Sequence, residues 1–196
     1  MDILVGCEES GTVRNAFAAR GHNAWSCDLQ EARDMSEKHI IGDVKEAIRR
    51  RKWDLIILHP PCTALALSGN RHYGVGKPRH EERIEAIDWT CHLLWLAMRQ
   101  AKAVCMENPA SVIFPVIRDE WPGVDVQYIQ PWEYGHGETK KTGLALYNLP
   151  RLKPTDVVDG RSDRIWKMGP SPWRAKERSV TYKGIAEAMA EQWSKI

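Results

Sequence analysis

The side chains best suited to covalent chemistry are a thiol and a carboxyl. Cys62 follows two prolines in the segment His59-Pro60-Pro61-Cys62, and Glu107 opens the segment Glu107-Asn108-Pro109. The prolines restrict the backbone and remove two amide donors, so they place the thiol on a rigid elbow. An accessible thiol with a lowered pKa is a nucleophile, and a carboxyl that burial keeps protonated is a general acid. We therefore expect nucleophilic addition by Cys62, assisted by a protonated Glu107.

A second group of polar residues follows three short apolar runs near the N-terminus. The first run leads into the turn Gly6-Cys7-Glu8-Glu9-Ser10-Gly11, and the next two end at Asp28 and Asp43. Two acids in the turn disfavour a bound pyrophosphate and favour a cofactor with an amino-acid or sugar portion. Asp28 is placed to accept hydrogen bonds from ribose hydroxyls, and Asp43 from an adenine amine. Each acid taken alone is equally typical of a helix N-cap or a surface position.

The elements that must position these residues alternate between short apolar runs and helical patterns. Strands are predicted at 3–5, 23–27, 39–41, 54–58, 103–106, 124–130 and 143–147, and helices at 12–20, 44–51, 81–100, 110–118 and 183–195. This alternation is typical of an α/β domain with a mainly parallel sheet. Because ligands bind at the carboxyl edge of such a sheet, the polar residues are expected to meet there.

Length and charge limit the other possibilities. With 196 residues the chain is expected to form one domain over 1–196. The net charge of +2 divides into −3 over residues 1–134 and +5 over residues 135–196. This excludes a histone-like polycation but allows a small basic footprint for nucleic acid.

Further classes are excluded by what the sequence does not contain. No apolar run approaches 18 residues and the N-terminus has no signal-peptide pattern, so we expect a cytoplasmic protein with no membrane partner. The cysteines are five in number and lack CxxC spacing: Cys7, Cys27, Cys62, Cys91 and Cys105. We therefore expect no disulfide framework and no metal site, with Cys91 and Cys105 as buried structural thiols.

The motifs resemble, in type and order, those of the DNA cytosine carbon-5 methyltransferases, in a short form familiar from bacteriophages and prophages. The resemblance rests on Val5–Gly11, Asp28, Asp43, Pro60-Pro61-Cys62, Glu107-Asn108-Pro109, Gly135–Leu146 at the place of the family's Gln-x-Arg-x-Arg strand, and Arg178–Trp193 at its final helix. It implies a Rossmann-like class I methyltransferase fold, with a mainly parallel seven-stranded sheet and helices on both faces.

The resemblance also assigns roles. S-adenosylmethionine is the implied cofactor, and its implied contacts are Gly6, Cys7, Glu8, Ser10, Gly11, Asp28, Asp43, Pro60 and Ala186. Cys62 adds to carbon 6 of cytosine, while Glu107 hydrogen-bonds ring nitrogen 3 and the exocyclic amine. Lys140 stands at the first arginine of the family motif, where it is expected to serve catalysis. The base must be flipped out of a duplex or supplied single-stranded.

The implied DNA contacts lie in three segments. The loop 66–79 resembles the family's mobile catalytic loop, although a solvated basic loop has the same composition. Residues 148–177 form a short basic segment in place of a target-recognition domain, which predicts a short or relaxed target sequence. The expected contacts are Ser68, Arg71, Lys140, Lys141, Thr142, Arg161, Arg164 and Arg174. A monomer is expected.

Three alternatives remain open at this point. The acidic turn admits another one-carbon donor, such as a folate that supplies a hydroxymethyl group. An inactive nucleic-acid-binding relative is possible, although the presence of both Cys62 and Glu107 argues against it. Free nucleotides are a further substrate class, which the basic C-terminal part disfavours.

Overall fold

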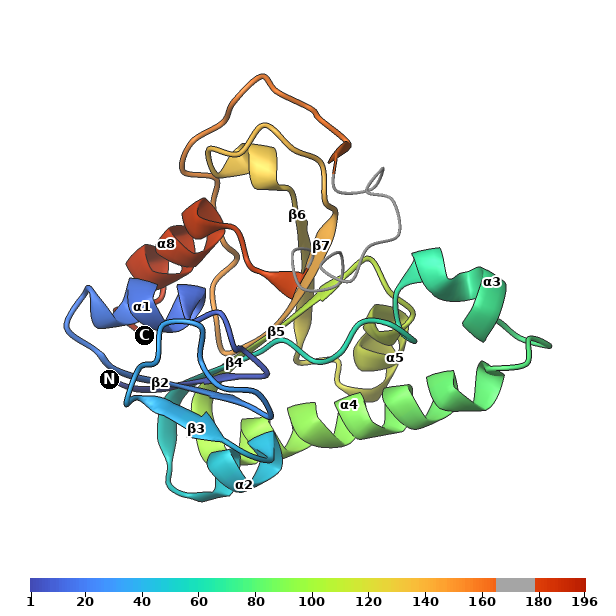
Figure 1. Cartoon of the computed structure of the whole chain (residues 1–196), viewed down its shortest axis with the longest axis horizontal. Helices are drawn as coiled ribbons and strands as arrows, with labels where there is room; N and C mark the ends of the chain where they lie inside the picture. The colour runs from blue at the N-terminus through green and yellow to red at the C-terminus, as the bar shows by residue number, and fades with distance from the viewer. Residues whose placement is uncertain (165–178) are drawn as a thin grey trace.

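A computed structural model describes residues 1–164 and 179–196 of the chain, in which one seven-stranded sheet forms the centre (Figure 1). The strands are β1 Asp2–Gly6, β2 Asn23–Asp28, β3 His39–Ile41, β4 Trp53–Leu58, β5 Ala101–Pro109, β6 Asp125–Ile129 and β7 Thr142–Tyr147. Their order is β3-β2-β1-β4-β5-β7-β6. The first five run parallel, and β7 lies antiparallel to both β5 and β6.

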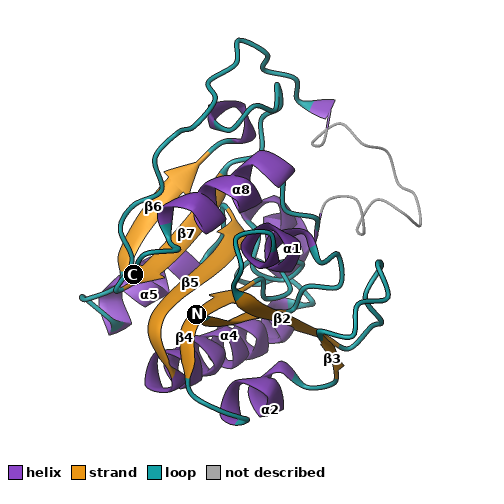
Figure 2. Cartoon of the chain, turned by 90° about the vertical axis from the view of Figure 1, so that its left-hand side faces the viewer, coloured by secondary structure: helices purple, strands orange, loops and turns teal. Residues whose placement is uncertain are grey.

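Helices cover both faces of the sheet (Figure 2). One face carries α1 Thr12–Ala18 and α8 Lys183–Gln192, and the other carries α2 Val44–Arg49, α4 His80–Gln100 and α5 Ile113–Glu120. The connection between β4 and α4 holds the 3-10 turn η1 Leu67–Gly69 and the short helix α3 Asn70–Tyr73, and η2 Pro131–Glu133 follows β6.

Two hydrophobic cores explain why the central strands are apolar throughout. Along β4, Leu55 and Ile57 pack under α1 and α8, while Ile56 and Leu58 pack against the helices of the opposite face. All four side chains are completely buried. A strand with no solvent-facing side loses the alternation of polar and apolar residues, as is typical of parallel sheets.

The predicted fold class is confirmed. Every predicted strand and helix is present, with each end within three residues of its predicted position. One shift of three residues is at α5, which begins at Ile113 because residues 110–112 make backbone hydrogen bonds with the β4–α4 connection and with Lys141. Within the described residues, no helix is long and apolar enough to cross a membrane.

Candidate active site

The ends of β4 and β5 bring the two expected chemical groups to neighbouring positions. The parallel register pairs Leu58 with Met106, so His59, directly after β4, lies beside Glu107, which is still within β5. The Nδ1 atom of His59 lies 3.0 Å from Oε2 of Glu107. One residue further along, the side-chain amide nitrogen Nδ2 of Asn108 donates to the backbone carbonyl oxygen of Pro60 at 3.0 Å.

These two contacts fix the elbow that carries Cys62. Its backbone carbonyl accepts from the amides of Leu65 and Ala66 at 3.1 and 2.8 Å, which closes a turn directly after the two prolines. Cys62 is partly accessible, unlike the fully buried Cys105. The elbow therefore presents a thiol at the carboxyl edge of the sheet, where ligands bind in open α/β folds.

The electrostatics of Glu107 correct one expectation. Burial raises the pKa of Glu107. The hydrogen bond with His59 and the positive charge of Lys140 together lower it by more than burial raises it, so the pKa lies below the usual value. Glu107 is thus an ionised carboxylate at neutral pH, and burial alone does not keep it protonated. Desolvation of Glu107 could be expected from the sequence, but the contacts with His59 and Lys140, which favour the charged form, could not.

Lys140 reaches the site because β7 runs antiparallel beside β5. The register pairs Pro109 with Thr142, and the amide of Ala110 donates to the carbonyl of Lys141 at 3.0 Å. Lys140 therefore lies next to the end of β5, and its Nζ atom is 5.8 Å from the centre of the Tyr182 ring, near the start of α8. Its charge acts on Glu107 from a third element.

The turn after β1 forms the second half of the site. Cys7 has a φ of 59°, a left-handed conformation that is rare for a residue with a side chain. Gly6 is required for packing, because a Cβ atom there would lie 2.6 Å from Val44 and 2.8 Å from Leu58. Burial together with the charges of Asp28 and Asp43 raises the pKa of the Cys7 thiol to about 12. The ends of β1, β2 and β3 thus gather around Cys7.

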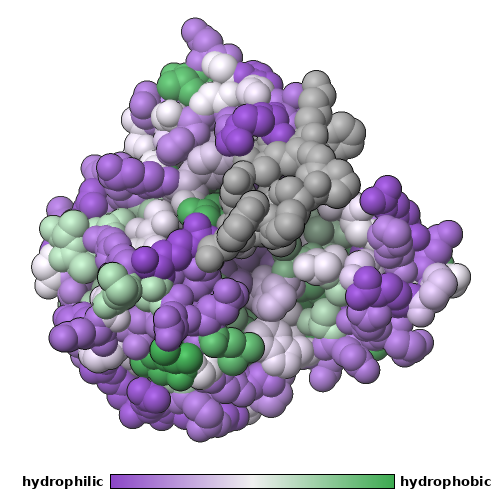
Figure 3. Space-filling model, in the orientation of Figure 1, coloured by the Kyte–Doolittle hydropathy of each residue, from purple (hydrophilic) through white to green (hydrophobic). Residues whose placement is uncertain are grey.

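Both aspartates lie where the sequence placed them. The Asp43 carboxylate caps α2 by accepting from the amide of Lys45 at 2.8 Å, and Asp28 accepts from the amide of Gln30 at 3.0 Å. The neighbouring apolar residues Leu29 and Ile41 are 79% and 60% exposed. Figure 3 shows hydrophobic surface over this end of the sheet, within a mainly hydrophilic face.

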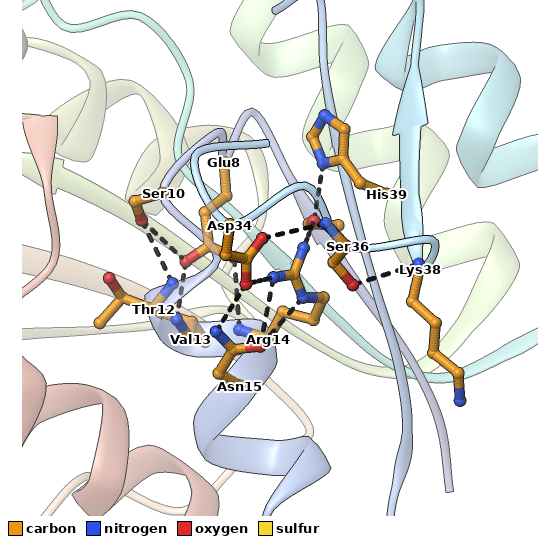
Figure 4. Close-up of polar contacts among 11 residues, drawn as sticks. Glu8, Ser10, Thr12, Val13, Arg14, Asn15, Asp34, Ser36, Lys38 and His39 are labelled. Atoms are coloured by element: carbon orange, nitrogen blue, oxygen red, sulfur yellow. Dashed lines mark hydrogen bonds and ion pairs between the residues drawn. The ribbon is translucent and has the colours of Figure 1, made fainter. Parts of the chain in front are cut away.

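The structure gives Glu8 a different role from the predicted cofactor contact. Its buried carboxylate accepts from the backbone amides of Val13 and Arg14, at 2.7 and 3.3 Å, and from the hydroxyl of Ser10 at 3.3 Å (Figure 4). Glu8 therefore caps the start of α1, since its carboxylate satisfies amides that have no partner within the helix. Gly11, with a φ of 71°, is the N-cap residue directly before the first helical residue, Thr12.

A buried arginine holds the segment between β2 and β3 against this turn (Figure 4). Arg14, 1% exposed, donates to Ser26 at 2.7 Å and pairs with Asp34, while Ser26 also contacts Nδ1 of His39 at 2.8 Å. The network was not foreseen, because Arg14 lies in an ordinary amphipathic pattern and Asp34 in an irregular segment.

Two further cofactor positions differ from expectation. Ala186 is completely buried between α8 and α1, within the core that includes Phe17, so its methyl group does not reach the site edge. Pro60 is also buried, and its contribution is the carbonyl oxygen that binds Asn108. The remaining cofactor positions are Gly6, Cys7 and Ser10, in the turn, with Asp28 and Asp43 beside it.

The expected mobile loop is anchored at its base. Buried Arg83 of α4 donates to the carbonyl of Ala64 and to the side chain of Asn70, both at 2.7 Å. Ser68 and Arg71, in η1 and α3, are exposed as expected of contacts with a polymer. Arg83 was missed because a cation within a charged helix start gives no signal of burial.

The segment before β7 separates its expected DNA contacts. Lys141 points to the opposite face of the sheet from Lys140, with Nζ 4.4 Å from the centre of the Tyr128 ring. Thr142 is 3% exposed, and its hydroxyl donates to the carbonyl of Lys140 at 3.0 Å. Burial of Thr142 in the strand contradicts its prediction as a DNA contact.

The basic C-terminal segment is already engaged within the chain. Arg164 pairs with Glu138 at 2.7 Å, and the Arg161 guanidinium lies 3.9 Å from the centre of the Trp132 ring. Both arginines have exposed surface, but neither is a simple solvated cation. Arg174 lies outside the described residues.

Comparison with known proteins defines the fold. The sequence matches neither a family model nor any curated protein. Among solved structures, the methyltransferase EhMeth of Entamoeba histolytica has a TM-score of 0.53 at 14% identity, covering 80% of this chain and 57% of that one. A DNA modification methyltransferase encoded within an Escherichia coli prophage gives 0.51 at 14%, covering 87% and 55%.

A third solved structure, NSun6 from Pyrococcus horikoshii with SFG, gives a TM-score of 0.51 at 14% identity, covering 76% of this chain and 48% of its own. The chain therefore has a Rossmann-like methyltransferase fold. It spans about half the length of these solved proteins.

Proposed function

We propose that the protein is a DNA cytosine carbon-5 methyltransferase that uses S-adenosylmethionine. The observation that carries the proposal is the meeting of three elements at one sheet edge. The elbow of Cys62 follows β4, Glu107 lies near the end of β5 with its carboxylate 3.0 Å from His59, and Lys140 leads into β7. A thiol, a carboxylate and a cation around one site suit nucleophilic addition to a polar ring.

The proposed chemistry assigns each group one task. The Cys62 thiolate forms a bond to carbon 6 of cytosine, and the electron pair of the C5–C6 double bond moves into the ring. Glu107 accepts a hydrogen bond from the exocyclic amine and, once it holds a proton, donates to ring nitrogen 3, while Lys140 stabilises negative charge on the ring carbonyl. After substitution at carbon 5, the C5 proton is released to solvent, the electron pair of the C5–H bond re-forms the C5–C6 double bond, and the C6–S pair leaves with the Cys62 thiolate.

The site edge is compatible with the cofactor. When bound, S-adenosylmethionine supplies the methyl group to carbon 5. In the proposal Asp28 accepts from the ribose hydroxyls and Asp43 from the adenine amine, and the exposed side chains of Leu29 and Ile41 would contact the purine face. The charges of both aspartates act on Cys7, so the residues assigned to the cofactor lie close together at these strand ends.

The acidic turn no longer favours a different donor. Glu8 is committed to α1, and Glu9 pairs with Arg33 at 2.7 Å. Since neither carboxylate is left as an uncommitted acid facing a ligand, the composition of the turn is explained by the fold. A folate-dependent transfer is therefore an outcome of the test below, as is modification of free nucleotides.

Product analysis tests the proposal. Purified protein is incubated with cytosine-containing duplex DNA, single-stranded DNA or dCMP. Each substrate is supplied once with S-adenosylmethionine and once with a folate that carries a one-carbon unit, and the digested nucleosides are measured by mass spectrometry. We expect 5-methylcytosine in DNA, complete loss of product in Cys62→Ala, and full product in Cys91→Ala, a matched control on α4. Product only from a folate donor, or equal activity of Cys62→Ala, would overturn the proposal.

A further inference from the structure

His59 contacts Glu107 but has no role in the chemistry proposed above. Its imidazole lies at the end of β4 with the side chain only 8% exposed, and its Nδ1 faces Glu107. The other ring nitrogen, Nε2, is buried and has no hydrogen-bond partner within residues 1–164 and 179–196. Within the described residues the contact between Nδ1 and Oε2 is therefore the one that orients the ring, and it directs the imidazole at the carboxylate of the candidate active site.

Addition to cytosine needs a proton donor at ring nitrogen 3. Ring nitrogen 3 of cytosine is a hydrogen-bond acceptor, and it becomes more basic as the Cys62 thiolate adds to carbon 6. A carboxylate is also an acceptor, so an ionised Glu107 has no proton to offer to that nitrogen. The partners of Glu107 favour its ionised form in spite of burial. A proton must therefore reach Glu107 from elsewhere.

We propose that His59 is the positioning residue that supplies this proton to Glu107 through the Nδ1–Oε2 contact. The inference rests on the proposed function, since it needs cytosine as the substrate. Histidine is the side chain whose charge ordinarily changes between pH 5 and 8, which suits a group that takes up and releases one proton in each cycle.

The proton transfers balance over the cycle. The imidazolium Nδ1–H bond breaks as a proton passes to Oε2 of Glu107, which leaves neutral His59 and a neutral carboxylic acid. During addition of the thiolate, the carboxylic acid transfers a proton to nitrogen 3 of the ring. When Cys62 leaves, that proton returns from nitrogen 3 to Glu107 and then to Nδ1, so the pair is restored.

The other ionisable groups around the pair have distinct places. Lys140 contributes a positive charge from the segment leading into β7, and Cys105 lies two residues before Glu107 in β5 with its thiol completely buried. Burial and the charge of Glu107 raise the pKa of Cys105 well above its usual value, so it stays neutral. Cys62, on the elbow, is the group that must lose its proton to act.

The test follows release of tritium from [5-³H]cytosine in DNA, which reports addition at carbon 6 whatever the donor. Rates are measured from pH 6 to 9 for wild type, His59→Asn and His59→Gln. In His59→Asn the side-chain amide nitrogen can take the place of Nδ1 as a donor to Glu107 but cannot transfer a proton. We expect the ratio of wild-type to His59→Asn rates to change with pH by up to about tenfold per pH unit, and to reach about 10²-fold on the acid side, because asparagine has no proton to transfer.

The outcomes separate this inference from the proposed function. A purely structural His59 would give a ratio that does not change with pH, or full rescue by His59→Asn, and either result would overturn the inference alone. Absence of both tritium release and product in wild type would overturn the proposed function and this inference with it.

Discussion

At the scale of single residues, the candidate site depends on charges that reach one carboxylate from different elements. His59 contacts Glu107 from β4, and Lys140 acts on it from the segment before β7. The carboxylate is buried, so each partner has a larger effect than it would have in water. The pKa of Glu107 is therefore a property of the assembled sheet edge.

Removal of the cation at position 140 should be visible in that pKa. In Lys140→Met we expect the pKa of Glu107 to rise, because a positive charge that favours the ionised form is lost. The measurement is a pH titration of the Glu107 carboxyl carbon by nuclear magnetic resonance.

A neighbouring lysine gives the matched control. Lys141→Met removes the same charge from the opposite face, where Nζ lies over Tyr128, so the pKa of Glu107 should change much less. An equal rise in both variants would mean that general surface charge, and not Lys140, sets the titration of Glu107.

At the scale of elements, the turn after β1 depends on the buried carboxylate of Glu8. The buried carboxylate of Glu8 accepts hydrogen bonds from the backbone amides of Val13 and Arg14. In Glu8→Gln one carboxylate oxygen becomes an amide nitrogen, which places donor against donor at the start of α1. We expect a loss of about 1 to 2 kcal/mol in the free energy of unfolding, measured by urea denaturation.

The control for this change is an acid on another helix. Glu46 in α2 is 71% exposed and pairs with Arg49, so Glu46→Gln should change the free energy of unfolding by about 0.5 kcal/mol or less. If Glu8→Gln were equally mild and cofactor affinity fell instead, Glu8 would be a ligand contact and not a structural cap.

The sequence was informative about elements and less so about their partners. The strands and helices were predictable because apolar runs such as those of β1 and β4 end at glycine, proline or aspartate. The positions of Cys62 and Glu107 followed from parallel strands sharing one edge. The Arg14 and Arg83 networks were not predictable, because each joins residues through side-chain reach that periodicity does not encode.

At the scale of the whole molecule, part of the positive charge of residues 135–196 is used in contacts within the chain. The positive C-terminal part suggested a surface for phosphates, yet Arg164 pairs with Glu138 and Arg161 stacks on Trp132. These cations help to join residues 131–140 with residues 153–164, where bridges link Tyr134 to Asp156 and Glu138 to Ser162. Part of the positive charge therefore holds the chain together.

The distribution of shifted pKa values also predicts how the stability of the fold depends on pH. The carboxyls of Glu107, Asp34 and Glu138 have lowered pKa values through hydrogen bonds and nearby cations, against the opposing effect of burial. A lowered pKa in the folded state stabilises the protein above the unfolded value, and that stabilisation is lost as the pH falls through the folded value. Exposed pairs contribute little, so buried Glu107 should dominate.

On the alkaline side, the buried thiols act in the opposite direction. Burial raises the pKa of Cys7 to about 12 and that of Cys27 to about 11, with further contributions from Asp28. A raised pKa means that the folded state holds protons that the unfolded chain releases. The stabilisation is therefore complete below about pH 8 to 9 and is lost as the pH rises toward the folded values.

Together these shifts predict a plateau of stability between about pH 5 and 8, with a decline on each side. Urea denaturation from pH 3 to 10 should show the free energy of unfolding falling by about 1 to 3 kcal/mol between about pH 7 and 3. In Glu107→Gln the acid decline should be shallower, because the buried carboxylate no longer takes up a proton on unfolding. An unchanged acid decline in that variant would place the acid sensitivity in the surface ion pairs, which about 1 M salt would then weaken.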